Sequence, residues 1–189
     1  MDHDHTGQLI FCGDAQNVPY GTIISQGCIY TASMESRTGA LSRSHRYKSG
    51  NKLKCPVATV QYRSFSLMTK GPVLLSCTQD GSLSFFSINL ESQGYLTLRC
   101  SLKLTSRIHT IRASFCPLLS LDKGEYIVAG SEDTHVNFYD LTRPKHTCVN
   151  KLQGHGFPVI GVAWNHGENL LASSDLYGVV IVWKRAKTK

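Results

Sequence analysis

The chain has 189 residues, of which 41% are hydrophobic and 17% are charged, and its net charge is +7. This balance is too apolar for a disordered chain. No stretch reaches the ~20 consecutive apolar residues of a membrane-spanning helix. We therefore expect a soluble, globular protein with no membrane partner.

The positive charge comes from 20 Lys and Arg residues against 13 Asp and Glu residues. Such an excess can mark an affinity for nucleic acid. Apart from a basic tail over residues 184–189, however, the cations are spread thinly through expected loops, as on an ordinary solvated surface. Binding to nucleic acid or chromatin through a basic face and this tail is therefore an alternative that we do not favour.

Seven cysteines are scattered along the chain without a C-x-x-C pair, and most lie inside apolar runs such as LIFCGD and LLSCTQD. Their odd count and irregular spacing argue against a disulfide framework. We interpret them as buried free thiols, which is typical of a protein in a reducing compartment.

In chain order, the first expected strands cover residues 8–14, 22–32 and 39–48. They have the layout of the last three strands of a four-stranded unit. We therefore assign residues 1–54 to a partial unit that lacks its inner strand and ends in a linker.

The next two units each contain an inner strand, a hairpin and an outer strand. Residues 55–105 hold these elements at 56–62, 74–88 and 95–104. Residues 106–153 hold them at 108–115, 126–141 and 145–153. The final unit, residues 154–189, has an inner strand and a hairpin but no outer strand, and it carries the basic tail.

Three hairpins share an acidic turn between two apolar strands. They are LLSCTQDGSLSFFSI (74–88), YIVAGSEDTHVNFYDL (126–141) and LLASSDLYGVVIVWKR (170–185). Asp80 and Asp133 each lie six residues before an aromatic residue, Phe86 and Tyr139 respectively. Asp in a tight turn can hydrogen-bond to its own backbone, so the same turn places an aromatic ring at the same point of each second strand. The spacing therefore indicates an internal repeat.

The last unit carries a more specific pattern. Gly154 and His155 open it, the strand LLASSD follows, and Trp183 lies 28 residues after His155. This spacing resembles the Gly-His to Trp-Asp repeat of the WD40 family, with Tyr139-Asp140 as the corresponding dipeptide of the preceding unit. The resemblance implies an all-β fold, a WD40-type β-propeller of about three and a half to four antiparallel, four-stranded blades.

The resemblance also implies a hydrogen-bonded tetrad in the last blade. Its expected members are His155, Ser173 or Ser174, Trp183 and a turn aspartate. Two positions depart from the family pattern: Asp175 lies eight residues before Trp183 instead of six, with Tyr177 in the usual place, and Lys184 replaces the usual Asp. We expect such a tetrad to brace the blade and to catalyse nothing.

Blades normally stack until a ring closes. Because the first unit lacks an inner strand and the last lacks an outer one, we expect the C-terminal part of a seven-bladed ring. Exposed strand edges would then promote self-association of this chain. A self-contained four-bladed ring is the alternative.

The sequence holds no G-x-S-x-G, no H-E-x-x-H and no glycine-rich phosphate loop. We therefore predict that the protein is not an enzyme and has no catalytic residue, cofactor or metal site. The N-terminal run Asp2, His3, Asp4 and His5 is expected to be a solvated terminus and not a metal site.

The resemblance implies a WD40 scaffold or adaptor for protein–protein interactions, in a nuclear regulatory complex and also in the cytoplasm. A substrate-receptor subunit of a ubiquitin ligase is a further alternative. Aromatic and arginine side chains near strand entries are the candidates for a partner-binding rim. These are Tyr62, Arg63, Arg107, His109 and Phe157.

Overall fold

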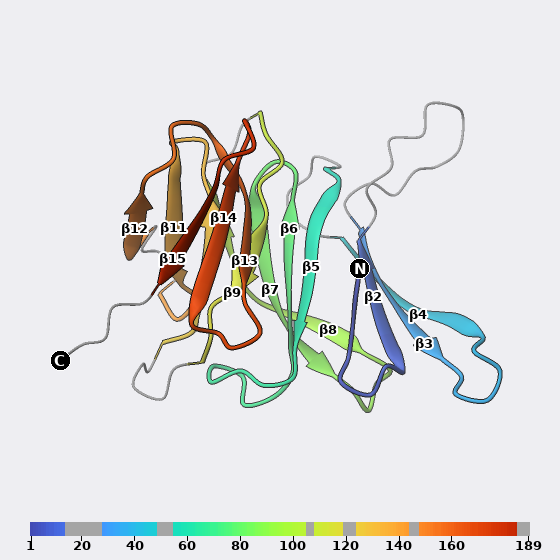
Figure 1. Cartoon of the computed structure of the whole chain (residues 1–189). Helices are drawn as coiled ribbons and strands as arrows, with labels where there is room; N and C mark the ends of the chain where they lie inside the picture. Colours follow the sequence, from blue (N-terminus) through green and yellow to red (C-terminus); the bar gives the residue numbers. More distant parts are fainter. Residues whose placement is uncertain (14–27, 49–54, 105–107, 119–123, 144–147, 185–189) are drawn as a thin grey trace, which may run out of the picture. The chain divides into compact units, whose positions relative to one another are not determined.

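The computed structural model describes residues 1–13, 28–48, 55–104, 108–118, 124–143 and 148–184. Over these residues it contains strands and turns but no α-helix, and hence no helix that could cross a bilayer. The chain divides into two compact units, residues 1–103 and 104–189, and each contains two antiparallel sheets (Figure 1).

The first unit is built from eight strands, and each sheet takes four consecutive strands in chain order. The first sheet contains β1 (Asp2–His3), β2 (Leu9–Gly13), β3 (Cys28–Met34) and β4 (Leu41–Lys48). The second sheet contains β5 (Val57–Arg63), β6 (Val73–Thr78), β7 (Ser82–Asn89) and β8 (Tyr95–Lys103).

The core of the first unit lies between these two sheets. Both sheets contribute alternate apolar side chains to it, as strands with one buried face must. Its buried members are Leu9, Phe11, Ile29, Val57, Val60, Leu74, Phe86, Ile88 and Leu96. The aromatic rings of Tyr47 and Tyr62 pack against this cluster.

The first sheet differs from the sequence expectation at its inner edge. Asp2 and His3 pair with β2 and form the short inner strand β1, which was expected to be missing. The buried carboxylate of Asp4 accepts hydrogen bonds from the backbone N–H of Leu9 and the hydroxyl of Thr6, which closes the turn between β1 and β2. Burial opposes ionisation of Asp4, but these hydrogen bonds outweigh it and lower the pKa. The N-terminal run was therefore wrongly interpreted as a frayed terminus.

The second unit contains the third and last sheets. The third sheet holds β9 (Ala113–Phe115), β10 (Tyr126–Gly130), β11 (His135–Asp140) and β12 (Asn150–Gln153). The last sheet holds β13 (Val159–Trp164), β14 (Leu170–Asp175) and β15 (Val180–Lys184). Strand β9 is shorter than expected and covers only the end of the predicted strand 108–115.

The second core packs β10 and β11 against β13 and β14. Its buried members are Cys116, Val128, Val136, Val159 and Leu171. Gly130 lies at a close approach of the two sheets, because a Cβ atom at this position would overlap the carbonyl oxygen of Val159. The rings of Trp164 and Trp183 are partly buried against the same core.

Four successive antiparallel sheets of three or four strands agree with the predicted all-β class and are consistent with WD40 propeller blades. In the part of the chain that the structure describes, the last sheet has three strands, and β15 is its edge. The predicted fold class is confirmed at this level.

Candidate functional site

The turn between β6 and β7 is organised by Asp80. Its carboxylate accepts hydrogen bonds from the backbone N–H and the hydroxyl of Ser82, at 3.1 and 3.0 Å, and from the hydroxyl of Thr78. The Lys103 ammonium, on β8, lies 2.6 Å from Oδ2 of Asp80. Burial raises the pKa of Asp80, but these partners outweigh it and lower the pKa to about 2. Asp80 therefore joins the hairpin to the outer strand.

The hairpin of the third sheet has a looser version of this arrangement. Asp133 accepts the backbone N–H of His135 at 3.3 Å, and its carboxylate lies 3.4 Å from Nζ of Lys151 on β12. At the far end of β11, Tyr139 is buried and the Asp140 carboxylate accepts the backbone N–H of Thr142 at 2.9 Å. These side chains hold turns and pack the core.

A continuous network of side chains connects the loop before β13 to β14 and β15. His155 lies 3.0 Å from the Asp175 carboxylate through Nδ1 and 2.7 Å from the Ser173 hydroxyl through Nε2. The indole N–H of Trp183 donates to the same hydroxyl at 2.8 Å. The serine in this network is thus Ser173, while the Ser174 side chain instead lies beside Gly161.

The shifted aspartate completes the network in spite of its spacing. Asp175 also accepts the backbone N–H groups of Tyr177 and Val179, at 3.1 and 3.0 Å, so it fixes the β14–β15 turn. Burial opposes its ionisation, but the hydrogen bonds from His155 and the two amides outweigh it and lower the pKa of Asp175. Gly154 leaves room for the network, because a Cβ atom there would come within 2.9 Å of the Trp183 ring.

This arrangement suits bracing better than catalysis. The side chains of His155 and Asp175 are each 1% exposed, and both imidazole nitrogens are engaged. A general acid or base must reach a substrate atom, and this imidazole is enclosed. Among the described residues, no group of three or more His, Cys, Asp and Glu side chains has the geometry of a metal site.

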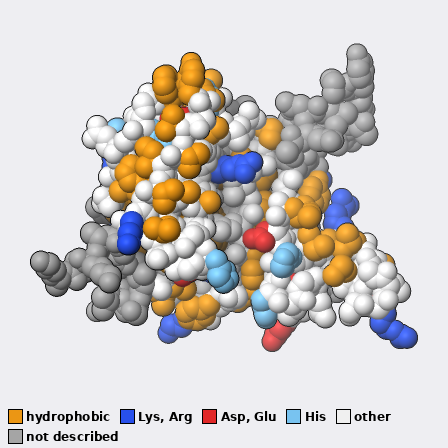
Figure 2. Space-filling model, viewed as in Figure 1, with side chains coloured by type: hydrophobic (Ala, Val, Ile, Leu, Met, Phe, Trp, Pro, Cys, Tyr) orange, Lys and Arg blue, Asp and Glu red, His pale blue; other side chains and the backbone are white. Residues whose placement is uncertain are grey.

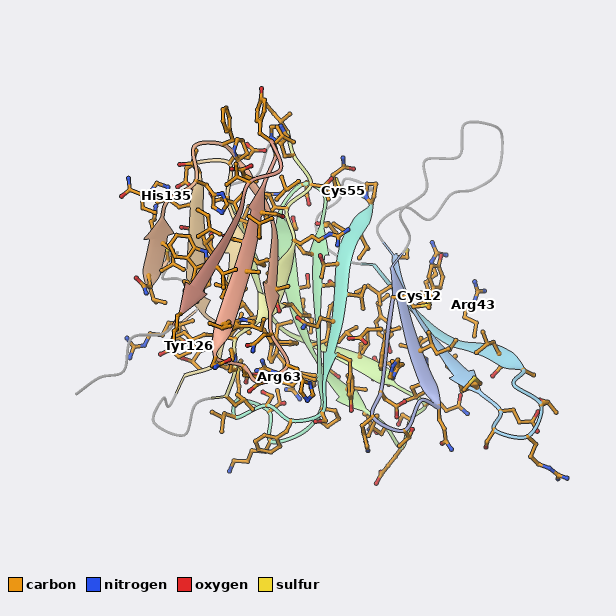
Figure 3. All side chains as sticks on the ribbon, in the orientation of Figure 1. Cys12, Arg43, Cys55, Arg63, Tyr126 and His135 are labelled. Carbon is orange, nitrogen blue, oxygen red and sulfur yellow. The ribbon has the colours of Figure 1, made fainter. Side chains whose placement is uncertain are left out.

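The five candidate rim residues are divided between the two units, with Tyr62 and Arg63 in the first and the other three in the second. Tyr62 and Arg63 are the last two residues of β5, at the end of the second sheet away from the Asp80 turn. Figure 3 labels Arg63 at this end of the strand and Cys55 just before its other end. Tyr62 stacks on the buried ring of Phe11 at 5.8 Å, and its backbone N–H donates to Asp2. Tyr62 is therefore a packing residue.

The other three candidates belong to the second unit. Arg107 lies outside the described residues. His109 is partly buried, and its backbone N–H donates to Glu132 in the β10–β11 turn at 2.8 Å. Phe157 precedes β13 and is 43% exposed.

Phe157 forms an exposed aromatic pair with Tyr177. Their ring centroids lie 4.0 Å apart, and Tyr177 is 71% exposed. The neighbouring Leu176 and Val179 are also exposed, and we call these four residues the turn patch. Figure 2 shows hydrophobic side chains gathered at the end of the second unit that carries this turn.

Sequence reasoning identified Phe157 but not the turn patch. Tyr177 occupies the position, six residues before Trp183, at which the other two hairpins have aspartate. Tight turns favour small polar residues, so a tyrosine flanked by Leu176 in such a turn was the available signal.

Residues 146–184 match the family model described as WD domain, G-beta repeat. One curated relative, a bromodomain and WD repeat-containing protein of Dictyostelium discoideum, is 24% identical over 67 residues. The aligned part covers 35% of this chain and 3% of that protein, so the chain matches only a small part of the relative. A WD40 repeat is therefore present, and its residues include the His155 network.

Proposed function

We propose that this chain is a non-enzymatic WD40 scaffold that binds protein partners through the turn patch. WD40 repeats generally serve as platforms for protein interactions, and the matched repeat carries the patch. The observation that supports the proposal best is the exposed aromatic pair of Phe157 and Tyr177. Exposed aromatic side chains are the residues that most often anchor protein interfaces.

The patch is held in place before any partner arrives. The backbone N–H of Leu176 donates to the carbonyl of Pro158 at 3.0 Å, which ties the Phe157 loop to the β14–β15 turn. Asp175 fixes the same turn from inside through the amides of Tyr177 and Val179. A rigid surface loses little conformational entropy on binding, so a small patch can contribute useful affinity.

The four side chains of the turn patch are uncharged, which favours a partner with apolar or aromatic side chains over nucleic acid. The stretch 114–183 resembles the C-terminal repeats of WD repeat-containing protein 13. On that resemblance we propose a nuclear regulatory complex as the setting.

The test is affinity purification of partners with the wild-type chain and with Phe157→Ala/Tyr177→Ala, followed by mass spectrometry. A matched control is Phe65→Ala/Met68→Ala, which removes two exposed apolar side chains from the β5–β6 loop of the other unit. We expect the first variant to lose its protein partners and the control to retain them, with unchanged thermal melting for both. Retention of every partner by the first variant, or partners released by nuclease, would contradict the proposal.

A further inference from the structure

The first unit contains a half-open cavity of about 620 Å³ between β4 and the β7–β8 hairpin. Apolar and aromatic side chains line one part of it, and hydroxyl groups with one lysine line the other. The members that matter below are Tyr47, Phe86, Leu98, Ser84, Ser101 and Lys103. The volume falls in the range of small-molecule sites, about 300 to 1,000 Å³.

The strand register explains this division. Residues directly opposite each other in an antiparallel pair share a face of the sheet. Phe86 pairs with Leu98 at the apolar end, which continues into the core. Ser84 pairs with Ser101 and Ser82 with Lys103 at the polar end. One face of the sheet therefore carries apolar side chains at the end next to the core and hydrogen-bonding side chains at the other end.

A β-bulge brings the two ends of the cavity onto one face. The register shifts between Phe85 and Phe86, so that Arg99 is left without an opposite residue. Leu98 and Ser101 are three positions apart, so in a regular strand they would point to opposite faces. The extra residue of the bulge places both on the same face.

Tyr47 forms a fixed wall on the side of the first sheet. Its hydroxyl accepts the backbone N–H of Leu96 at 2.6 Å, and its ring meets Tyr95 at 5.7 Å and Phe86 at 6.4 Å between centroids. The aromatic wall is thus built by contacts between the two sheets and does not depend on a ligand.

Ser84 is the residue that points to a ligand. It is only 2% exposed, it lines the cavity, and its hydroxyl hydrogen-bonds to none of the described residues. The hydroxyl is not among the fully enclosed polar atoms that lack a partner, so it is accessible from the cavity. A molecule in the cavity with a polar group at this point would supply a hydrogen-bond partner.

The charges at the polar end favour an uncharged polar group. Among the described residues that line the cavity, Lys103 alone is charged, and its ammonium is held by Asp80 at 2.6 Å and by the Ser82 hydroxyl at 3.1 Å. The Asp80–Lys103 pair carries no net charge, so a charged head group would lose hydration in the cavity without meeting a net opposite charge. An uncharged polar group avoids most of this cost.

We propose that this cavity binds a neutral organic molecule, with an aromatic or aliphatic body between Tyr47, Phe86 and Leu98. Its uncharged head, an amide or an alcohol, hydrogen-bonds to Ser84 and Ser101. This site lies in the first unit and is separate from the turn patch, so its failure would leave the proposed scaffold function untouched.

The test uses the full 189-residue chain and three probes of equal length, 4-phenylbutanamide, 4-phenylbutyrate and 4-phenylbutylamine. Binding is followed by chemical-shift changes of the β7 and β8 backbone amides. We expect millimolar or tighter binding of the amide, and weaker binding of both ions by about tenfold or more. No shift changes with the amide, or an ion that binds as tightly as the amide, would overturn the proposal.

Two variants locate the probe. Ser84→Ala should weaken binding of the amide about fivefold, the effect of losing one neutral hydrogen bond. Leu98→Trp, at an exposed position, should fill the apolar part of the cavity and abolish binding. Val149→Trp, at a similarly exposed position in the other unit, is the matched control and should bind as wild type does. Wild-type affinity in both Ser84→Ala and Leu98→Trp would place the probe elsewhere and refute the site.

Discussion

Nδ1 of His155, in the loop before β13, lies 3.0 Å from the carboxylate of Asp175 at the end of β14, although the two residues are 20 positions apart. The bond joins the loop before β13 to the β14–β15 turn. These are the two loops that carry the turn patch. The buried network therefore holds in place the loops on which the exposed patch lies.

Ser173→Ala should destabilise the second unit by about 2 to 3 kcal/mol, because it removes the acceptor of Trp183 and a partner of His155 inside the core. Both tryptophans of the chain, Trp164 and Trp183, lie in the last sheet, so their fluorescence during urea unfolding measures this unit.

Ser174→Ala is the matched control for this prediction. Its hydroxyl hydrogen-bonds to no described residue, and the change should cost less than about 0.5 kcal/mol. The indole N–H resonance of Trp183 should also move in Ser173→Ala alone. Equal unfolding midpoints for the two variants would show that the network does not brace the sheet.

The stability of the first unit should fall in acid through Asp80. Its pKa is about 2 in the folded chain, below its ordinary value of 3.8. A carboxyl with a lowered folded-state pKa contributes its full stabilisation above about pH 4, and loses it as the pH falls towards 2. We expect a loss of about 1 to 2 kcal/mol across this window, allowing for the solvent-exposed Lys103.

The measurement is urea unfolding followed by circular dichroism across that pH window, for wild type and Asp80→Asn. The variant should be less stable than wild type at neutral pH and should show a flatter dependence on pH. Asp133→Asn removes a more exposed carboxylate with a longer contact to lysine, so its effect should be smaller. If the stability of wild type and of Asp80→Asn had the same dependence on pH, Asp80 would not be the cause of the loss of stability in acid.

The hairpins could be predicted from sequence because their signals are local. Alternating apolar residues and a turn aspartate lie within a few positions of each other, as around Asp80 and Asp133. The spacing from Gly154-His155 to Trp183 likewise identified the last repeat. Each of these features needs only one short segment of chain.

The missed features depend on contacts between distant segments. Strand β1 has two residues, and Asp2 is held by the backbone of Tyr62, 60 positions away. The cavity depends on a β-bulge in β8 opposite Phe85 and Phe86. No residue in this segment has a type that would predict the bulge. The positions of Tyr62 and Arg63 at the opposite end of their sheet from Asp80 follow from strand register, which hydropathy alone does not provide.

Gly130→Ala should destabilise the second unit by about 2 kcal/mol or more, because the added methyl group would overlap the carbonyl oxygen of Val159 and force the two sheets apart. Gly156→Ala is the matched control, since a Cβ atom at that position meets nothing within 4 Å. Tryptophan fluorescence during urea unfolding measures both. Equal stabilities would show that the sheets do not approach closely at Gly130.

Cys77 should resist thiol reagents in the native protein. It is fully buried in β6, and burial, with a smaller effect of the nearby Asp80 carboxylate, raises its pKa to about 12. At pH 8 only about one molecule in 10,000 then carries the reactive thiolate, even before access is considered. The partly exposed cysteines should react first, and these are Cys12, Cys55, Cys100 and Cys148. Iodoacetamide labelling followed by peptide mass spectrometry should therefore modify these four in native protein and Cys77 only after denaturation. Labelling of Cys77 at the rate of Cys100 would mean that the β6 core opens readily, and would contradict the packing described for the first unit.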